Sequence, residues 1–133
     1  MTERSPGARI LVIDDDDLVR DTVRDMLESG GHEARAVADG VAGLDALAAD
    51  PADLVVTDIL MPNKDGVETI IALRRRFPGV KIIAMSGGGQ ARNLDFLELA
   101  AKVGASEVLV KPFTREALLA AVARVLGTPG REG

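Results

Sequence analysis

The sequence predicts an α/β protein in which a five-stranded parallel sheet, doubly wound, carries helices on both faces. Two observations support this prediction. Short apolar runs alternate with amphipathic helical patterns along a chain of 133 residues, which is typical of βαβ units and a parallel sheet. The right-handed crossover between parallel strands then places helices on both faces. The pattern leaves the order of the strands open.

Five apolar runs are expected to form the strands. They cover residues 9–14, 33–37, 53–58, 80–86 and 108–111. Runs of this length without alternation are typical of strands that are buried on both faces. The run at 33–37 is the weakest, so we place it nearer the edge of the sheet.

The helices are expected between these strands, each with one apolar face. The first begins near Asp16 and Asp17 and ends at Gly30 and Gly31, and the second opens at Asp39 and Gly40. In the first three helices the residues expected to face the core are Leu18, Val19, Val23, Met26 and Leu27; Val41, Leu44 and Leu47; and Val67, Ile70 and Ile71. In the last two helices they are Leu94, Leu97 and Ala101, and Leu118, Leu119, Val122, Val125 and Leu126, with Asn93 and Thr114 as caps.

Composition and charge exclude several classes of function. The net charge is −5, and the one basic cluster, at 74–76, stands where cations complement a helix end, so a broad surface for nucleic acid or an anionic membrane is not expected. The chain has no cysteine, and neither a signal-peptide pattern nor an apolar run of membrane-spanning length occurs. We therefore expect a cytoplasmic protein, in which the single histidine, His32, is an ordinary surface residue.

Charged and polar residues close four of the five apolar runs. Asp14 and Asp15 follow the first run, Asp58 the third, Ser86 the fourth and Lys111 the fifth. Because the carboxyl ends of parallel strands share one end of the sheet, we expect these side chains to meet. Three adjacent carboxylates repel one another unless a cation neutralises them, and oxygen ligands of high charge suit Mg²⁺. A metal, a carboxylate, a hydroxyl and an ammonium together can bind a phosphoryl group.

These motifs resemble those of the response-regulator receiver domain, the phosphoacceptor module of two-component signalling. The matching segments are ILVIDDD at 10–16, VVTDILMPNKDG at 55–66, IIAMSG at 82–87 and VLVKPF at 108–113. The resemblance implies a flavodoxin-like fold over residues 9–127, with tails at 1–8 and 128–133. No output domain follows, so the expectation is a stand-alone receiver domain.

The resemblance implies a phosphoryl-binding role for four residues. Asp58 would accept the phosphoryl group as an acyl phosphate. Ser86 would donate its hydroxyl to one phosphoryl oxygen, Lys111 would offer its charge to another, and Gly87 would lie against the bound group. In the family the peptide bond between the lysine and Pro112 is typically cis.

The resemblance also implies a Mg²⁺ (or Mn²⁺) site. Asp15 and Asp58 would be direct ligands, Leu60 would contribute its backbone carbonyl, and Asp14 would act through a metal-bound water. Four acids stand in a row at 14–17. The first two are chosen because the apolar run ends just before them and the helical stripe begins just after the last.

The implied function is phosphorelay signal transduction, by a phosphoacceptor that is not an enzyme but assists its own phosphorylation and dephosphorylation. The donor would be a phosphohistidine of a sensor histidine kinase or of a histidine phosphotransfer protein. The output would be contact with an unknown downstream protein or onward relay of the phosphoryl group, by a monomer or weak homodimer that binds neither nucleic acid nor membrane.

Three features depart from the family pattern. Val108 stands where the family often has an aromatic switch residue, and the Gly-rich segment after Ser86 is longer than usual. Leu60 and Gly88 occupy positions that tune the lifetime of the phosphoryl group, and neither side chain can hydrogen-bond an attacking water. We therefore expect slow autodephosphorylation.

Other functions remain open at this level. A receiver-like adaptor would act through its surface without accepting phosphate, although the intact set of site residues argues against it. A flavodoxin-like binding protein could use Gly87–Gly89 as a phosphate cradle, but the nearby acids would repel an anionic cofactor that lacks a metal. A hydrolytic enzyme would need an acid two residues after Asp58, where Leu60 stands.

Overall fold

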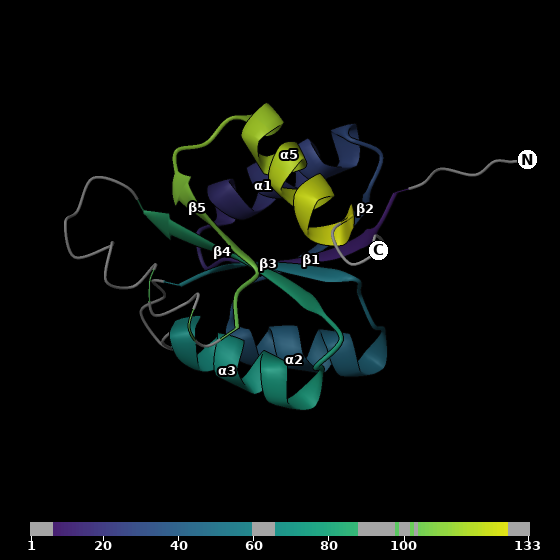
Figure 1. Cartoon of the computed structure of the whole chain (residues 1–133), viewed down its shortest axis with the longest axis vertical. Helices are drawn as coiled ribbons and strands as arrows, with labels where there is room; N and C mark the ends of the chain where they lie inside the picture. The colour runs from purple at the N-terminus through teal and green to yellow at the C-terminus, as the bar shows by residue number, and fades with distance from the viewer. Residues whose placement is uncertain (1–6, 60–65, 88–97, 99–101, 103, 128–133) are drawn as a thin grey trace, which may run out of the picture.

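The five strands of the protein form one parallel sheet, seen along the middle of Figure 1. The computed structural model describes residues 7–59, 66–87, 98, 102 and 104–127. The strands are β1 (Arg9–Ile13), β2 (Glu33–Val37), β3 (Leu54–Asp58), β4 (Lys81–Gly87) and β5 (Glu107–Lys111). The helices with described bounds are α1 (Asp17–Ser29), α2 (Gly40–Ala49), α3 (Gly66–Arg76) and α5 (Arg115–Gly127).

The strand order is β2-β1-β3-β4-β5, and every neighbouring pair is parallel. The position of β2 at one edge of the sheet confirms the expectation from its weak apolar run. β1 pairs with β2 on one side and with β3 on the other, so that Ile13 lies in register with both Val37 and Thr57. The direction of winding therefore reverses beside the carboxyl end of β1, where ligands bind in open α/β sheets.

Helices cover both faces of the sheet, which confirms the predicted fold class. α1 and α5 lie on one face, and α2 and α3 lie on the other (Figure 1). Alternate residues of β1 enter the two cores, since Ile10 and Val12 pack with the α1 and α5 side, whereas Leu11 and Ile13 pack with the α2 and α3 side. This burial on both faces explains why β1 is apolar without alternation.

Three helix residues that were expected to face the core are exposed instead. Leu18 is 75% exposed, Val41 57% and Ile71 39%. Neighbouring residues on a helix are separated by about 100°, so burial of Ile70 turns Ile71 outward. Val41 is two residues, or about 200°, from the buried Gly43, so it faces away from the sheet.

Gly43 explains why the buried face of α2 was wrongly predicted. A Cβ atom at this position would lie 2.4 Å from Cδ1 of Ile13, so a larger residue would force the Ile13 side chain to shift, whereas glycine lets α2 approach β1 without that change. A glycine adds nothing to an apolar stripe. The pattern of large apolar residues therefore pointed to Val41.

The helix starts lie where the sequence placed them, and Thr114 was also expected to be a cap. The carboxylate of Asp16 accepts hydrogen bonds from the backbone N–H groups of Leu18 and Val19, which makes it the N-cap of α1. Asp39 caps α2 in the same way. Thr114 precedes α5, and its hydroxyl accepts a hydrogen bond from the N–H of Ala117.

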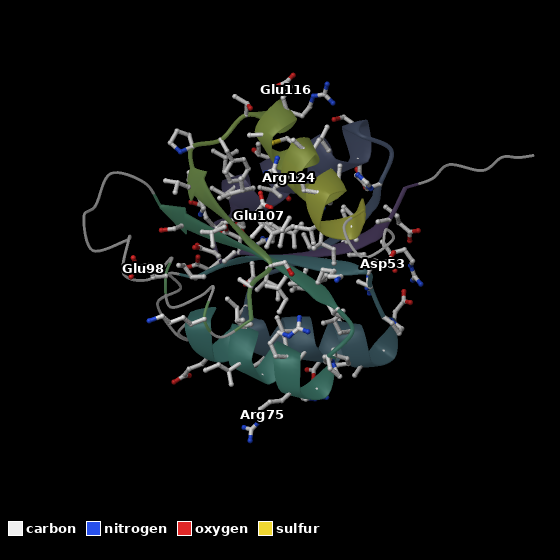
Figure 2. The ribbon with its side chains drawn as sticks, in the orientation of Figure 1. Asp53, Arg75, Glu98, Glu107, Glu116 and Arg124 are labelled. Carbon is white, nitrogen blue, oxygen red and sulfur yellow. The ribbon has the colours of Figure 1, made fainter. Side chains whose placement is uncertain are left out.

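The basic cluster at 74–76 forms the last turn of α3, as predicted, and Figure 2 shows Arg75 pointing away from the sheet. His32 departs from its prediction. It is half-buried, and its Nδ1 accepts a hydrogen bond of 3.0 Å from the backbone N–H of Ala8. Burial lowers the pKa of His32 below its usual value.

Some expectations lie outside the described residues. They concern Leu60, Gly88, the expected cap Asn93, and Leu94, Leu97 and Ala101, which were expected to face the core. Among the helices that the structure describes, none has the length and apolarity needed to cross a membrane.

Candidate functional site

The carboxyl ends of four strands bring together residues that lie far apart in the sequence. Asp14 follows β1, Asp58 is the last residue of β3, Ser86 lies near the end of β4 and Lys111 ends β5. Asp14, Asp58 and Ser86 are all buried, with exposed fractions of 5% or less. Parallel pairing places Ser86 in register with Val110 and Gly87 in register with Lys111. These residues therefore share one end of the sheet, as the sequence predicted.

Three carboxylates converge at this end of the sheet. Asp14, Asp15 and Asp58 each offer an oxygen atom, and these atoms all lie within 4.8 Å of one another. Asp14 and Asp58 are buried, whereas Asp15 is exposed, so the group opens to solvent on the side of Asp15. Carboxylate oxygens at this spacing are suited to a hard divalent cation such as Mg²⁺.

Lys111 supplies a positive charge to the carboxylate group. Its Nζ lies 3.2 Å from Oδ2 of Asp14 and 3.4 Å from Oδ2 of Asp58. Burial alone would lower the pKa of Lys111, but the charges of Asp58 and Asp14 and their hydrogen bonds outweigh this effect and raise it. Lys111 therefore stays protonated at neutral pH. When the three carboxylates are ionised, one ammonium leaves two negative charges, which a divalent cation would balance.

The four consecutive acids at 14–17 have four different structural roles. Oδ1 of Asp14 accepts a hydrogen bond of 2.9 Å from the backbone N–H of Asp16, and its Oδ2 accepts one from Nζ of Lys111. Asp15 is the exposed member of the carboxylate group. Asp16 caps α1, and Asp17 forms an ion pair with Arg20. The first two acids thus belong to the site and the last two to the helix start.

Arg20 contacts the site and was missed by the sequence analysis. Its Nη1 donates a hydrogen bond of 2.9 Å to the backbone carbonyl of Asp14. The spacing of Asp17 and Arg20 along a helix could have signalled the ion pair. No sequence pattern signals a contact with a backbone carbonyl in the preceding turn.

For the remaining predicted site residues, the structure gives the position in the fold or does not describe the residue. Ser86 and Gly87 lie at the same end of the sheet as the carboxylates. Leu60, the predicted carbonyl ligand, lies outside the described residues. The peptide bond between Lys111 and Pro112 is cis, as the resemblance implied.

A surface groove adjoins the site. It has a volume of about 270 Å³ and lies between α1 and the segment that joins β5 to α5. Its lining is mostly apolar and includes Leu18, Val19, Met26, Lys111, Pro112 and Phe113. Lys111 is thus shared between the groove and the carboxylate group.

A doubly wound parallel sheet with three carboxylates and a lysine at its carboxyl end is typical of receiver-type signalling domains. The family model described as "Response regulator receiver domain" matches residues 10–123 of this chain. The protein therefore belongs to the response regulator receiver domain family.

Similar proteins agree with this assignment. The response regulator protein FleR of Pseudomonas aeruginosa is 39% identical over 128 residues, which cover 95% of this chain and 26% of FleR. The response regulator MprA of Mycobacterium tuberculosis is 37% identical over 121 residues, which cover 90% of this chain and 51% of MprA. The chain thus spans about half or less of the length of these relatives.

A solved structure supports the fold directly. The receiver domain of NtrX from Brucella abortus superimposes with a TM-score of 0.84 at 30% sequence identity, and the match covers 90% of this chain and 98% of that domain. Here the two chains agree over nearly their whole lengths. The five-stranded, doubly wound architecture is therefore the receiver-domain fold.

Proposed function

We propose that this protein accepts a phosphoryl group on Asp58 from a phosphohistidine of a sensor histidine kinase or a histidine phosphotransfer protein. One observation carries the proposal: the carboxylates of Asp14, Asp15 and Asp58 lie within 4.8 Å of one another, with the ammonium of Lys111 against two of them. Such a group can hold a divalent cation and a phosphoryl group together. Membership of the receiver family supports the same chemistry.

In the proposed step an oxygen of Asp58 attacks the phosphorus atom. A P–O bond forms and the P–N bond to the donor histidine breaks, with the electron pair returning to the imidazole nitrogen. Bound Mg²⁺ (or Mn²⁺) would neutralise the carboxylates and the phosphoryl oxygens. Asp14, Asp15 and Asp58 would hold it, together with the backbone carbonyl of Leu60. Transfer of this kind depends mainly on positioning and charge stabilisation.

Lys111 and Ser86 would stabilise the product. Lys111 already lies 3.4 Å from Oδ2 of Asp58, so its ammonium can move from the carboxylate to a phosphoryl oxygen with little displacement. Ser86 would donate its hydroxyl to a second oxygen, with Gly87 beside the group. These contacts would favour phosphorylated Asp58 because ionised partners strengthen hydrogen bonds.

The proposed output is a change in protein contacts or onward relay of the phosphoryl group. Val108 cannot act as an aromatic switch, but it is partly buried and packs against the core on the α2 and α3 side. Movement at Ser86 would reach it through β4, where Ala84 pairs with Val108. Coupling would therefore proceed by aliphatic repacking within a receiver domain spanning residues 9–127. The domain is proposed to be cytoplasmic and to be a monomer or weak homodimer.

Intact-mass measurement tests the phosphorylation directly. The protein is incubated with acetyl phosphate, and separately with a phosphorylated histidine kinase, with and without Mg²⁺. We expect a Mg²⁺-dependent gain of one phosphoryl group that is lost in Asp58→Ala. Asp45→Asn, an exposed acid on α2, is the matched control and should be labelled as the wild type is. No gain from either donor would overturn the proposal and leave an adaptor that acts through its surface.

The lifetime of the phosphoryl group is a separate part of the proposal. Neither Leu60 nor Gly88 can orient a water molecule through its side chain, so autodephosphorylation is proposed to be slow. The mass of the phosphorylated protein is followed after removal of the donor, and Leu60→Asn should shorten its lifetime. Equal lifetimes in the two proteins would contradict this role of Leu60.

A further inference from the structure

We infer that Arg20 is a positioning residue: by fixing the peptide group between Asp14 and Asp15, it holds the carboxylate of Asp15 in place for the divalent cation. The inference rests on the proposed function, because it concerns the metal site of that function. It assigns a role to a residue that lies outside the carboxylate group itself.

The side chain of Arg20 joins the turn after β1 to the first turn of α1. Its Nη1 donates to the carbonyl oxygen of Asp14 at 2.9 Å, and its Nη2 donates to Oδ1 of Asp17. The side chain of Arg20 is 19% exposed, whereas that of its partner Asp17 is 85% exposed. Arg20 is therefore drawn inward, toward the backbone of the site, and does more than form a surface ion pair.

The contact with Asp14 constrains Asp15 through the geometry of the peptide bond. A peptide group is planar, so a hydrogen bond that fixes the carbonyl of Asp14 also fixes the N–H and the Cα of Asp15. The other polar atoms of Asp14 are held as well: its N–H by the carbonyl of Val37 at 3.1 Å, and its carboxylate by Asp16 and Lys111. Arg20 thus completes the anchoring of the residue that precedes the exposed ligand.

Two effects of Arg20 would change the affinity for the metal in opposite directions when this residue is replaced: its charge and its positioning of Asp15. A guanidinium that contacts the backbone of the site repels a metal cation bound there, so its removal would strengthen metal binding if only its charge mattered. If it positions Asp15, its removal weakens binding, as is usual for partners that orient metal ligands. The sign of the change therefore distinguishes the two effects.

α1 offers a matched control for this experiment. Arg24 pairs with Asp21 at 3.5 Å, with the same spacing of three residues as Arg20 and Asp17. Both arginines lie on the same helix, about one turn apart. Arg24 pairs with Asp21 on the same helix, so Arg24→Met removes an equivalent ion pair and leaves the proposed anchor at Asp14 in place.

The test measures the affinity of the full chain for Mn²⁺ by electron paramagnetic resonance of the free ion. We expect Arg20→Met to bind about tenfold more weakly than the wild type and Arg24→Met to bind equally well. Arg20→Lys should also bind more weakly, because an ammonium is a point charge that cannot bridge the two acceptors as a planar guanidinium does. The amide NMR signal of Asp15 should shift in both Arg20 variants before any metal is added.

Each outcome decides the inference. Circular dichroism establishes that each variant is folded, and Arg20→Lys, which keeps the charge and most of the stem, replaces Arg20→Met if the latter does not fold. A folded Arg20 variant that binds Mn²⁺ as well as or better than the wild type would overturn the inference alone. A wild type that binds no Mn²⁺, or an Asp15→Asn variant that binds it normally, would overturn the metal site of the proposed function and this inference with it.

Discussion

The two ends of the sheet carry charged residues in different ways. At the carboxyl end, Asp14 and Asp58 are buried and share the single ammonium of Lys111. At the amino end, which Figure 2 locates by Asp53, Arg9 pairs with Asp50 and both side chains are nearly half exposed. One end therefore holds a buried excess of negative charge, and the other holds balanced pairs in contact with water.

This difference separates a functional arrangement from a surface arrangement. Exposed ion pairs contribute little to stability because water screens them and ordering the side chains costs entropy. A buried group of like charges destabilises the fold until a cation enters. We therefore expect the carboxyl end to lower the stability of the metal-free protein, and we propose that the same charges bind a cation and a phosphoryl group.

Replacement of Lys111 should have the largest effect. Lys111→Met leaves Asp14 and Asp58 buried without a cation, so we expect the metal-free protein to lose about 3 kcal/mol of its free energy of unfolding. Urea denaturation in the presence of a chelator measures the change. Lys81→Met, at the amino end of β4, is the control and should change little. Equal losses in the two variants would show that burial of charge does not distinguish the ends of the sheet.

Neutralisation of Asp58 should act in the opposite direction. Two carboxylates lie within 4.8 Å of that of Asp58 and one ammonium lies 3.4 Å from it. We expect the repulsion to exceed the attraction, so Asp58→Asn should raise the free energy of unfolding of the metal-free protein by about 2 kcal/mol. Mg²⁺ should stabilise the wild type, by about 2.7 kcal/mol at one hundred times its dissociation constant, and should stabilise the variant less. Thermal unfolding with and without Mg²⁺ measures both effects. A variant that is less stable than the wild type without metal would contradict the view that these charges repel.

The amino end should tolerate loss of an ion pair. Arg9→Met removes the contact with Asp50, and we expect the urea midpoint to stay close to that of the wild type because both side chains are exposed. The phosphorylation rate with acetyl phosphate should also be unchanged. A loss comparable to that of Lys111→Met would remove the contrast between the two ends.

The smallest expected effect concerns His32, near the amino end. Burial lowers its pKa in the folded state, and its Nδ1 must be unprotonated to accept the N–H of Ala8. Above the unfolded pKa of about 6.5 the imidazole is neutral in both the folded and the unfolded protein, so its full contribution to stability is present there. This contribution should be lost as the pH falls through the lower folded pKa, because the unfolded protein then binds the proton more readily. His32→Asn removes the titrating group and should flatten this dependence in urea midpoints measured at several pH values. An unchanged pH dependence would assign it to other groups.

The sequence predicted the strands better than the faces of the helices. All five strands were located to within a residue or two. The signal was clearest for β1 and β3, which are buried on both faces and must therefore be largely apolar. The prediction failed at Leu18 and Ile71, since adjacent apolar residues on a helix compete for one face, and it failed at Val41 for another reason. At α2 the close approach to β1 depends on Gly43, whose contribution to packing is the lack of a side chain.

The site was predictable to the extent that its residues stand at strand ends. Asp14, Asp15, Asp58 and Lys111 each follow or close an apolar run, and parallel strands bring such residues to one end of a sheet. The contact between Arg20 and the carbonyl of Asp14 was not predictable, because backbone acceptors are the same at every residue and carry no sequence signal.

The sequence by itself determined where the strands and helices lie and that carboxylates, a hydroxyl and an ammonium stand at the strand ends, because these features depend on local hydrophobic patterning. Only the tertiary structure decided the order β2-β1-β3-β4-β5 and the meeting of Lys111 with Asp14, which is 97 residues away along the chain. The physical reason is that strand order and long-range contacts depend on how the helices pack on the two faces of the sheet, and no short segment of the chain encodes that packing.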